Sequence, residues 1–169
     1  MRIVKIGHKA LRGKCKKVSQ TELRSRKFQT FLKSMIKTMR LAQGVGLAAN
    51  QVAVSCRAVV LECRANQRYP HAEDFPLQIF INPRILRYSK EKIFDWEGCL
   101  SIPGYRGLVP RSKKVTFEAL SPEGKRVVQT VEGFHARVIQ HEVDHISGKF
   151  YIDRMPDLMS WTHLEEWQR

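Results

Sequence analysis

Residues 140–148 read Gln-His-Glu-Val-Asp-His-Ile-Ser-Gly and contain a His-Glu-x-x-His motif. On a helix, residues four positions apart lie on the same face, about one turn apart. His141 and His145 could therefore bind one metal ion as neutral imidazoles, with Glu142 beside them to exchange a proton with water. The alternative is a core helix whose two histidines bond to backbone carbonyls. Glu142 counts against that alternative, because a carboxylate on a buried helix needs a partner.

The residues before the motif predict the helix that carries it. Phe134, Val138, His141 and His145 follow a spacing of three or four residues, which is typical of one helix face. Gly148 follows the last turn and is a typical helix end. This helix would carry apolar residues at its start and metal ligands at its end.

Two histidines do not complete a catalytic metal site of the zinc type, which usually has a third protein ligand and an open position for water. The metzincin proteases supply that ligand by extending the motif to Gly-x-x-His. Here Gly148 is present, but Tyr151 stands where the next histidine would be. The third ligand must therefore come from another part of the chain.

The length and composition of the chain indicate one domain. Its 169 residues are enough for a single domain with a sizeable core, so we expect residues 1–169 to form one catalytic domain. No apolar run is long enough to span a membrane, and no apolar signal core opens the chain, so we expect a cytoplasmic protein. The cysteines form no Cys-x-x-Cys pair, and we expect free thiols, one of which could be a ligand. They are Cys15, Cys56, Cys63 and Cys99.

The positive charge is concentrated near the N-terminus. The formal net charge is +14, and residues 1–40 hold thirteen basic residues and one acid, a net charge of +12. Such asymmetry favours an anionic partner, for example RNA or a membrane surface. A solvated face that keeps the protein soluble explains the same pattern, and both interpretations stay open.

The hydrophobic pattern predicts an α+β fold. An extended arm over 1–18 leads to Ser19, which opens a capping-box pattern, and an amphipathic helix follows at 22–42. We expect a polar loop at 64–76. Strands are predicted at 57–62, 77–82, 115–120 and 126–131, with two more within 84–96, and a last helix at 157–167.

Three blocks together resemble the peptide deformylases: Gly-Val-Gly-Leu-Ala-Ala-Asn-Gln at 44–51, Glu-Gly-Cys-Leu-Ser at 97–101, and the motif at 140–148. The resemblance extends from the N-terminal arm to about Met155. It implies an α+β fold in which antiparallel strands surround a central metal-binding helix. It also implies the reaction, removal of the formyl group from N-terminal N-formylmethionine of nascent polypeptides with release of formate.

The resemblance also assigns the reacting groups. It makes Cys99 the third ligand, and one thiolate with two imidazoles leaves one open corner for water. Glu142 would then handle the proton of the attacking water, while the Gln51 amide and the Leu100 backbone N–H meet the oxyanion. The family commonly uses iron(II), and nickel, cobalt or zinc can replace it, whereas ligand chemistry alone would favour zinc. A thiolate ligand would be open to oxidation.

The same resemblance implies how the substrate binds. The methionine side chain would enter an apolar pocket, and the backbone of Val45 and Gly46 would pair with the extended peptide. The expected pocket walls are Val45, Leu100, Phe134 and Val138.

Three departures from the family pattern affect these expectations. Asn50 stands where many members have proline, at a variable position where we expect little effect on the chemistry. Arg137 precedes Val138 and leaves the side-chain preference of the pocket open. The tail after Met155 is shorter than the long C-terminal helix of some bacterial members, which weakens any argument for ribosome docking through it. The basic residues 1–40 could instead face the ribosome surface.

Two other functions are compatible with parts of the sequence. A metalloprotease would take its third ligand from His163, Glu165 or Glu166, although it would not need Cys99. A nucleic-acid-binding protein would use the basic segment 1–40, although no zinc knuckle, RNA-recognition signature or interleaving of basic and aromatic residues supports it. The oligomeric state cannot be inferred from the sequence.

Overall fold

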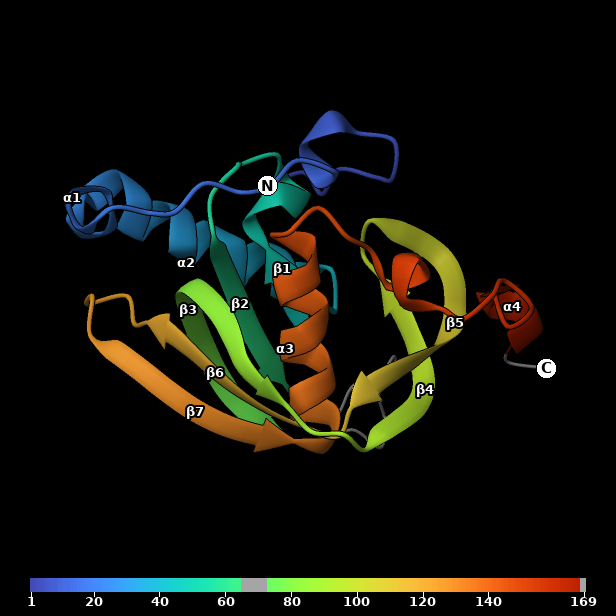
Figure 1. The fold of residues 1–169 in the computed structure, drawn as a ribbon. Helices are drawn as coiled ribbons and strands as arrows, with labels where there is room; N and C mark the ends of the chain where they lie inside the picture. The colour runs from blue at the N-terminus through green and yellow to red at the C-terminus, as the bar shows by residue number, and fades with distance from the viewer. Residues whose placement is uncertain (65–72, 168–169) are drawn as a thin grey trace.

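The computed structural model describes residues 1–64 and 73–167 and has an α+β fold with two antiparallel sheets (Figure 1). One sheet has five strands in the order β1-β2-β3-β6-β7, and the other has three in the order β4-β5-β8. The strands are β1 (Gly46–Ala48), β2 (Ala58–Cys63), β3 (Phe75–Tyr88), β4 (Lys92–Cys99), β5 (Ile102–Ser112), β6 (Lys114–Leu120), β7 (Arg126–Glu132) and β8 (Thr162–His163). Both β1 and β4 therefore have one edge that no other strand of the described residues covers.

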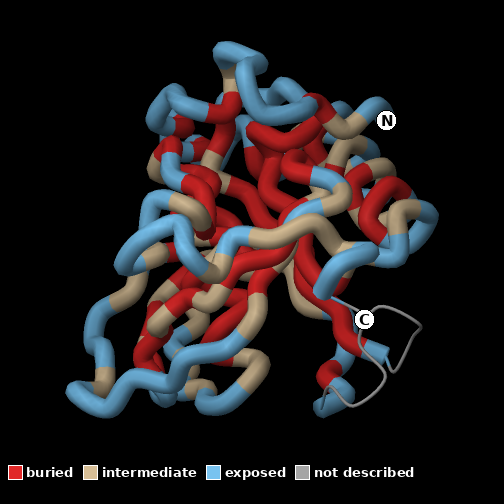
Figure 2. Tube along the Cα trace, turned by 90° about the vertical axis from the view of Figure 1, so that its right-hand side faces the viewer, coloured by how far each residue is buried: buried red, intermediate tan, exposed pale blue. Residues whose placement is uncertain are grey.

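Two of the helices lie on opposite faces of the five-stranded sheet, and the last helix lies against the smaller sheet. The helices are α1 (Gln20–Arg24), α2 (Arg26–Leu41), α3 (Gly133–His145) and α4 (Leu164–Trp167). Helix α3 lies between the two sheets, and α2 covers the opposite face of the larger sheet (Figure 1). Ala136 and Ile139 of α3 are fully buried against β2, β3 and β6, while Leu32 and Met35 of α2 pack on the other side. Figure 2 shows the buried segments gathered in the interior, with the exposed turns around them.

The predicted helix over 22–42 is interrupted. Ser19 opens α1 as predicted, and its side chain accepts a hydrogen bond from Glu22 N. Ser25 then adopts an extended conformation, ends α1 and begins α2, because its hydroxyl accepts from Phe28 N. A serine side chain that bonds to the backbone in this way competes with helix continuation, so two helices replace the single predicted one.

The predicted strands are present, with different boundaries. The strands at 77–82 and 84–88 are one strand, β3, in which Asn82 (φ +54°) and the following proline form an irregularity of the ladder. Strand β5 was not predicted, because Pro103 and Gly104 read as a turn. The predicted loop at 64–76 lies mostly outside the described residues, and β3 already begins at Phe75.

The predicted helix at 157–167 is wrong for most of its length. Only residues 164–167 are helical, and Thr162 and His163 form β8 instead. Here Ser160 Oγ accepts from Leu108 N at 3.1 Å, and β8 pairs with β5. Pairing with a neighbouring strand outweighs local helix preference in this segment.

The N-terminal arm ties the three motif blocks together. Apart from a short 3₁₀ turn at Lys9–Leu11, residues 1–18 contain no helix and no strand. Val4 N donates to Gln51 O at 2.9 Å, Ile6 N to Ser101 O at 2.8 Å, and Cys15 N to Ile146 O at 3.0 Å. The arm thus fastens the loop at 49–52, the end of β4 and the end of α3 to one another.

Gly148 makes a close approach that only glycine permits. Its φ is +77°, and a Cβ there would lie 2.4 Å from the carbonyl oxygen of Arg12. The turn after α3 can therefore pass directly over the N-terminal arm. None of the helices in the described residues combines the length and the apolar character that crossing a bilayer requires.

Candidate metal centre

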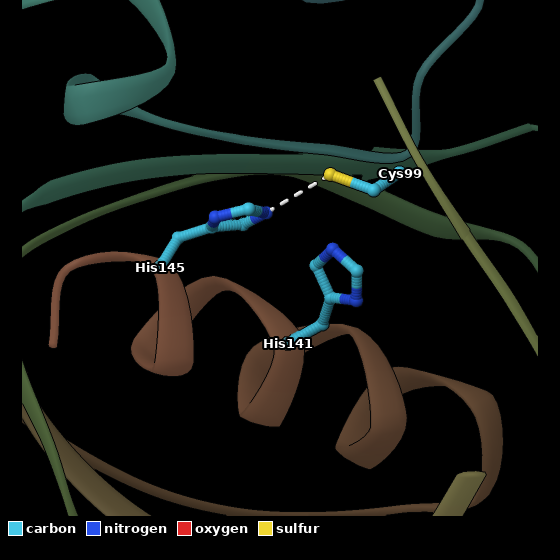
Figure 3. Close-up of side chains that lie close together, drawn as sticks. All are labelled: Cys99, His141 and His145. Carbon is cyan, nitrogen blue, oxygen red and sulfur yellow. Dashed lines mark hydrogen bonds between the residues drawn. The ribbon is translucent and has the colours of Figure 1, made fainter. Parts of the chain in front are cut away.

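Cys99, His141 and His145 meet between the two sheets (Figure 3). Cys99 ends β4, and both histidines point from α3 toward its sulfur. One ligand atom from each residue lies within 4.8 Å of the other two, and Cys99 Sγ is 3.2 Å from His145 Nε2. Cys99 and His145 are buried, with exposed fractions of 4% and 0%.

Hydrogen bonding determines which nitrogen of His141 can bind a cation. His141 Nδ1 lies 2.9 Å from Glu97 Oε2. Because a carboxylate only accepts, Nδ1 carries the hydrogen, and in the neutral ring Nε2 keeps its lone pair. Burial, and then the neighbouring His141, lower the pKa of His145, which favours the neutral ring there as well. Despite its burial, the hydrogen bonds to Cys99 and Glu97 raise the pKa of His141 well above its usual value, so this ring must release its Nε2 proton when a cation binds.

Glu97 belongs to a buried network of paired charges. Its carboxylate accepts from Arg111 Nε at 2.8 Å and Nη2 at 3.0 Å, and from Arg137 Nη1 at 2.8 Å. Burial alone would raise the pKa of Glu97, but Arg111 and the hydrogen bond from His141 hold it well below its usual range. Arg111 also donates to Asp144 at 2.5 Å, and Asp144 accepts two bonds from Arg154. The described charges of this cluster are thus paired, as buried charges must be.

Arg137 stabilises the wall of the site and does not present a free charge to it. Its guanidinium donates to the carbonyl oxygens of Ile93 at 2.7 Å and Val109 at 2.9 Å, besides Glu97. The exposed fraction of its side chain is 5%. Arg137 thus joins α3 to β4 and β5.

Glu142 is buried beside the three ligands and has a raised pKa. Its exposed fraction is 3%, and burial raises its pKa to about 7. A Cβ on Gly46 would lie 2.4 Å from Glu142 Oε1, so this glycine gives the carboxylate its space. Among the described residues, Oε2 has no hydrogen-bonding partner. A buried carboxylate with a free oxygen is suited to accept a proton near neutral pH.

Gln51 is held with its amide NH₂ toward Cys99. Its Oε1 accepts from Ala48 N at 2.8 Å, while Nε2 donates to Ser101 Oγ at 3.2 Å and lies 3.6 Å from Cys99 Sγ. The side-chain oxygen is occupied by the backbone, which fixes the amide orientation and leaves the donor end facing the candidate site.

Two neighbours of the site were not recognised as such from the sequence. Glu97 was quoted only as part of a motif, and Asn50 was expected to have little effect. Asn50 is fully buried and donates to the backbone carbonyl of His145 at 2.5 Å. Both residues lie directly beside a predicted ligand in sequence or in space, and buried polar side chains of this kind need partners. The need of a buried polar side chain for a partner could have identified Glu97 and Asn50 as neighbours of the site.

A cavity opens over the site between β1 and β4. It encloses about 500 Å³ including its open mouth. Its lining contains the predicted wall residues Val45, Leu100, Phe134 and Val138 together with Gly46, Gln51, Cys99, His141, Glu142, Trp96, Glu97, Gly98, Gly44 and Arg137. His145 is absent from this lining and lies deeper. With that exception, the structure brings every residue predicted from the sequence to one cavity.

The three ligand residues fit a divalent transition metal. A thiolate with two imidazoles is a donor set suited to such ions, and three protein ligands leave a position for water or substrate. Among the described residues, His145 Nδ1 bonds to no partner, so its ring is held in place by packing and by contacts at Nε2. The alternative ligand His163 instead packs against Tyr105 and faces Glu165 at 3.9 Å, which does not support a protease-type ligand set.

Comparison with known proteins gives consistent matches over nearly the whole chain. The family model described as polypeptide deformylase matches residues 1–161. The chain is 40% identical to peptide deformylase 2 of Pseudomonas putida over 163 residues, which cover 96% of this chain and 92% of that protein. It is 44% identical to peptide deformylase 1 of Bordetella pertussis over 137 residues, 81% of this chain and 78% of that one.

Solved structures with the same fold are also similar in sequence. The Met-Ala-Ser-bound crystal structure of class I type b peptide deformylase from Acinetobacter baumannii superposes with a TM-score of 0.89 at 37% identity. The match covers 92% of this chain and 98% of that chain.

Proposed function

The chain belongs to the peptide deformylase family, and on that premise we propose that Cys99, His141 and His145 hold the metal ion of its active site. Its reaction is removal of the N-terminal formyl group from nascent polypeptides. The observation that carries the site assignment is the convergence of one sulfur and two imidazole nitrogens within 4.8 Å, next to a buried carboxylate. In this proposal α3 is the central metal-binding helix, and α2 is the amphipathic helix that supports the sheet behind it.

The metal is proposed to be iron(II) in the cell, with zinc, nickel or cobalt able to replace it. When bound, such an ion would polarise the formyl carbonyl and lower the pKa of a water molecule. Metal analysis of protein purified without oxygen tests this identity. Iron at about one ion per chain supports the proposal, whereas zinc after anaerobic purification contradicts it.

Glu142 is proposed to move the proton during hydrolysis. Its unpartnered Oε2 accepts a proton from the attacking water and returns it to the leaving amine, and its pKa of about 7 suits both directions. Gly46 permits this position, because any larger residue there would displace the carboxylate.

Two donors are proposed to stabilise the oxyanion of the tetrahedral intermediate. The first is the Gln51 amide, whose orientation is set by its bond to Ala48 N. The second is the backbone N–H of Leu100, next to Cys99. Donors held in place before the reaction stabilise developing charge without reorganisation, which is why this kind of group contributes strongly to rate.

The substrate is proposed to bind as an extended peptide along the uncovered edge of β1. The backbone of Val45 and Gly46 would pair with it, and the methionine side chain would enter the pocket formed by Val45, Leu100, Phe134 and Val138. Recognition through the main chain suits an enzyme whose substrates differ after the first residue.

A direct assay tests the reaction and separates it from proteolysis. The protein is incubated with formyl-Met-Ala-Ser and, in parallel, with unformylated Met-Ala-Ser. We expect release of formate from the first peptide and no cleavage of the second. Cleavage of a Met-Ala or Ala-Ser bond would indicate a protease instead.

We further propose that residues 1–169 act as one catalytic domain in the cytoplasm, where nascent chains emerge. Residues 1–40, with their net charge of +12, are proposed to approach the ribosome surface. This proposal rests on charge alone. RNA binding that persists in a Glu142 variant without activity would show that nucleic-acid binding is a separate property of the chain.

A further inference from the structure

The segment Ser160–Trp167, here called the C-terminal clasp, lies along β5. Its strand β8 pairs antiparallel with β5, with Tyr105 opposite His163 and Arg106 opposite Thr162. At its start, Ser160 Oγ accepts from Leu108 N at 3.1 Å. The clasp thus adds a third strand to the smaller sheet, whose strand β4 ends at Cys99.

Aromatic side chains anchor the clasp. Trp161 stacks on Tyr105 with ring centroids 4.5 Å apart, and its Nε1 donates to the hydroxyl of Tyr151 at 3.1 Å. Gly104 leaves room for His163, because a Cβ there would lie 3.2 Å from His163 Nε2. A strand pairing, a stacked pair of aromatic rings and a hydrogen bond therefore hold the clasp on β5.

The last residue of α4 reaches the strand that borders the active-site cavity. The Trp167 ring contacts the Trp96 ring edge to face at a centroid distance of 5.7 Å. The Arg106 guanidinium lies 4.6 Å over the same Trp167 ring. Trp96 in turn lines the cavity, three residues before Cys99 on β4. Trp167 therefore touches a wall residue of the cavity without lining the cavity itself.

The position of Trp96 on β4 indicates which part of a bound peptide its indole ring would contact. On β4, Glu97 points into the buried charge network, so Trp96 lies on the opposite face of the strand and at the outer rim of the cavity. The proposed methionine pocket is formed by Phe134 and Val138, which come from α3 and not from β4. A substrate side chain beyond the methionine is thus the part of the peptide that meets the indole.

We propose that Trp167 is a positioning residue for substrate binding, which holds Trp96 as an apolar wall for the residues that follow formylmethionine. The inference rests on the proposed function of the cavity and adds to it a role for the C-terminal clasp. The substrate class that gains most is a formylmethionyl peptide with an apolar or aromatic second or third residue, because flat rings pack best on an immobilised indole.

The test compares Trp167→Leu with the parent on three substrates: formylmethionine amide, which has no side chain after methionine, formyl-Met-Ala-Ser and formyl-Met-Phe-Phe. For Trp167→Leu we expect KM to rise about two- to tenfold for the aromatic tripeptide, the range of one lost aromatic contact. The rise should be smaller for formyl-Met-Ala-Ser, and kcat should change little for either peptide. Trp167→Phe keeps a ring in the same place and should restore KM.

Two further variants make the outcome decisive. Met159→Ala removes an exposed side chain just before the clasp and should match the parent on all three substrates. Combining Trp96→Ala with Trp167→Leu should raise KM for the aromatic tripeptide no further than Trp96→Ala does, because one residue acts through the other.

An equal rise of KM for formylmethionine amide and the aromatic tripeptide, or no rise for either, would overturn the role of Trp167. Additive increases of KM for the aromatic tripeptide in the double variant would also overturn it. Failure of the parent protein to deformylate any of the three substrates would instead contradict the proposed function.

Discussion

Glu97 Oε2 lies 2.9 Å from His141 Nδ1, so a residue two positions before the proposed ligand Cys99 orients a second proposed ligand on a different element. The two parts of the site, β4 and α3, are therefore joined by a hydrogen bond as well as by any metal they share. Partners of this kind fix the tautomer and the direction of a ligand ring.

Replacing Glu97 should weaken both metal binding and the fold. In Glu97→Gln the Arg111 and Arg137 guanidinium groups lose their shared carboxylate, and His141 loses its acceptor charge. We expect metal affinity to fall about ten- to a hundredfold, and unfolding free energy to fall by about 3 kcal/mol or more. Metal competition with a chelator and urea unfolding measure the two effects. Glu91→Gln, which removes an exposed carboxylate paired with Lys113, is the control and should change neither quantity.

Glu142→Gln should keep the metal and lose the reaction. The amide has the same shape as the carboxylate and fits beside Gly46, but it cannot accept the proton. We expect kcat to fall roughly a hundredfold or more, with unchanged metal content and melting temperature. Turnover close to that of the parent would exclude Glu142 as the general base.

Cys99→Ser should abolish tight metal binding. A serine hydroxyl is a weak ligand for the metals that imidazole and thiolate bind, so the metal should be lost on dialysis together with activity. Cys63→Ser is the matched control, because Cys63 is also a buried free thiol but lies in the core of the larger sheet. Full metal occupancy of the Cys99 variant after dialysis would show that the thiol is only structural.

Gln51→Ala should lower turnover more than binding. The amide contributes as charge develops on the substrate oxygen, so kcat should fall by about a hundredfold or somewhat less, with little change in KM. Steady-state kinetics on formyl-Met-Ala-Ser separates the two constants. An effect confined to KM would assign Gln51 to substrate binding.

Replacing Lys14, Lys16 and Lys17 with Gln tests the proposed approach to the ribosome. All three side chains are exposed and lie outside the cavity. Turnover of a short formyl peptide should not change, whereas co-sedimentation with ribosomes should weaken, most clearly at low ionic strength. The charge-matched control replaces Lys113, Lys114 and Lys125. Equal binding by parent and triple variant across a salt series would mean that the basic segment is only a solvated face.

The elements with a regular hydrophobic pattern were predictable from the sequence. Helix α3 follows from the spacing of Phe134, Val138, His141 and His145, and the β6–β7 hairpin from the turn between its strands. Strand β5 was missed because Pro103 and Gly104 are typical of turns. The short strand β8 was missed because its pairing with β5 is a long-range contact that no local pattern records.

The residues of the candidate site that belong to the three sequence motifs were predictable. Through family resemblance, their order indicated the three proposed ligands, Gln51 and Glu142, and the structure brings these residues together. The supporting groups were not predictable, since Arg111 and Arg137 reach Glu97 from β5 and α3 across the fold. Such pairings depend on which side chains meet in the interior, and a single sequence does not contain that information.

The proposed binding of the peptide along the uncovered edge of β1 would have a consequence for the range of proteins that this enzyme can serve. Affinity gained through backbone N–H and C=O groups is the same for every sequence that can extend into the cleft, with proline as the exception because it lacks the N–H. Under that proposal, one enzyme would process newly made chains of very different sequence at comparable rates. In the same proposal, the side chains after methionine would change those rates only where they contact the rim of the cavity.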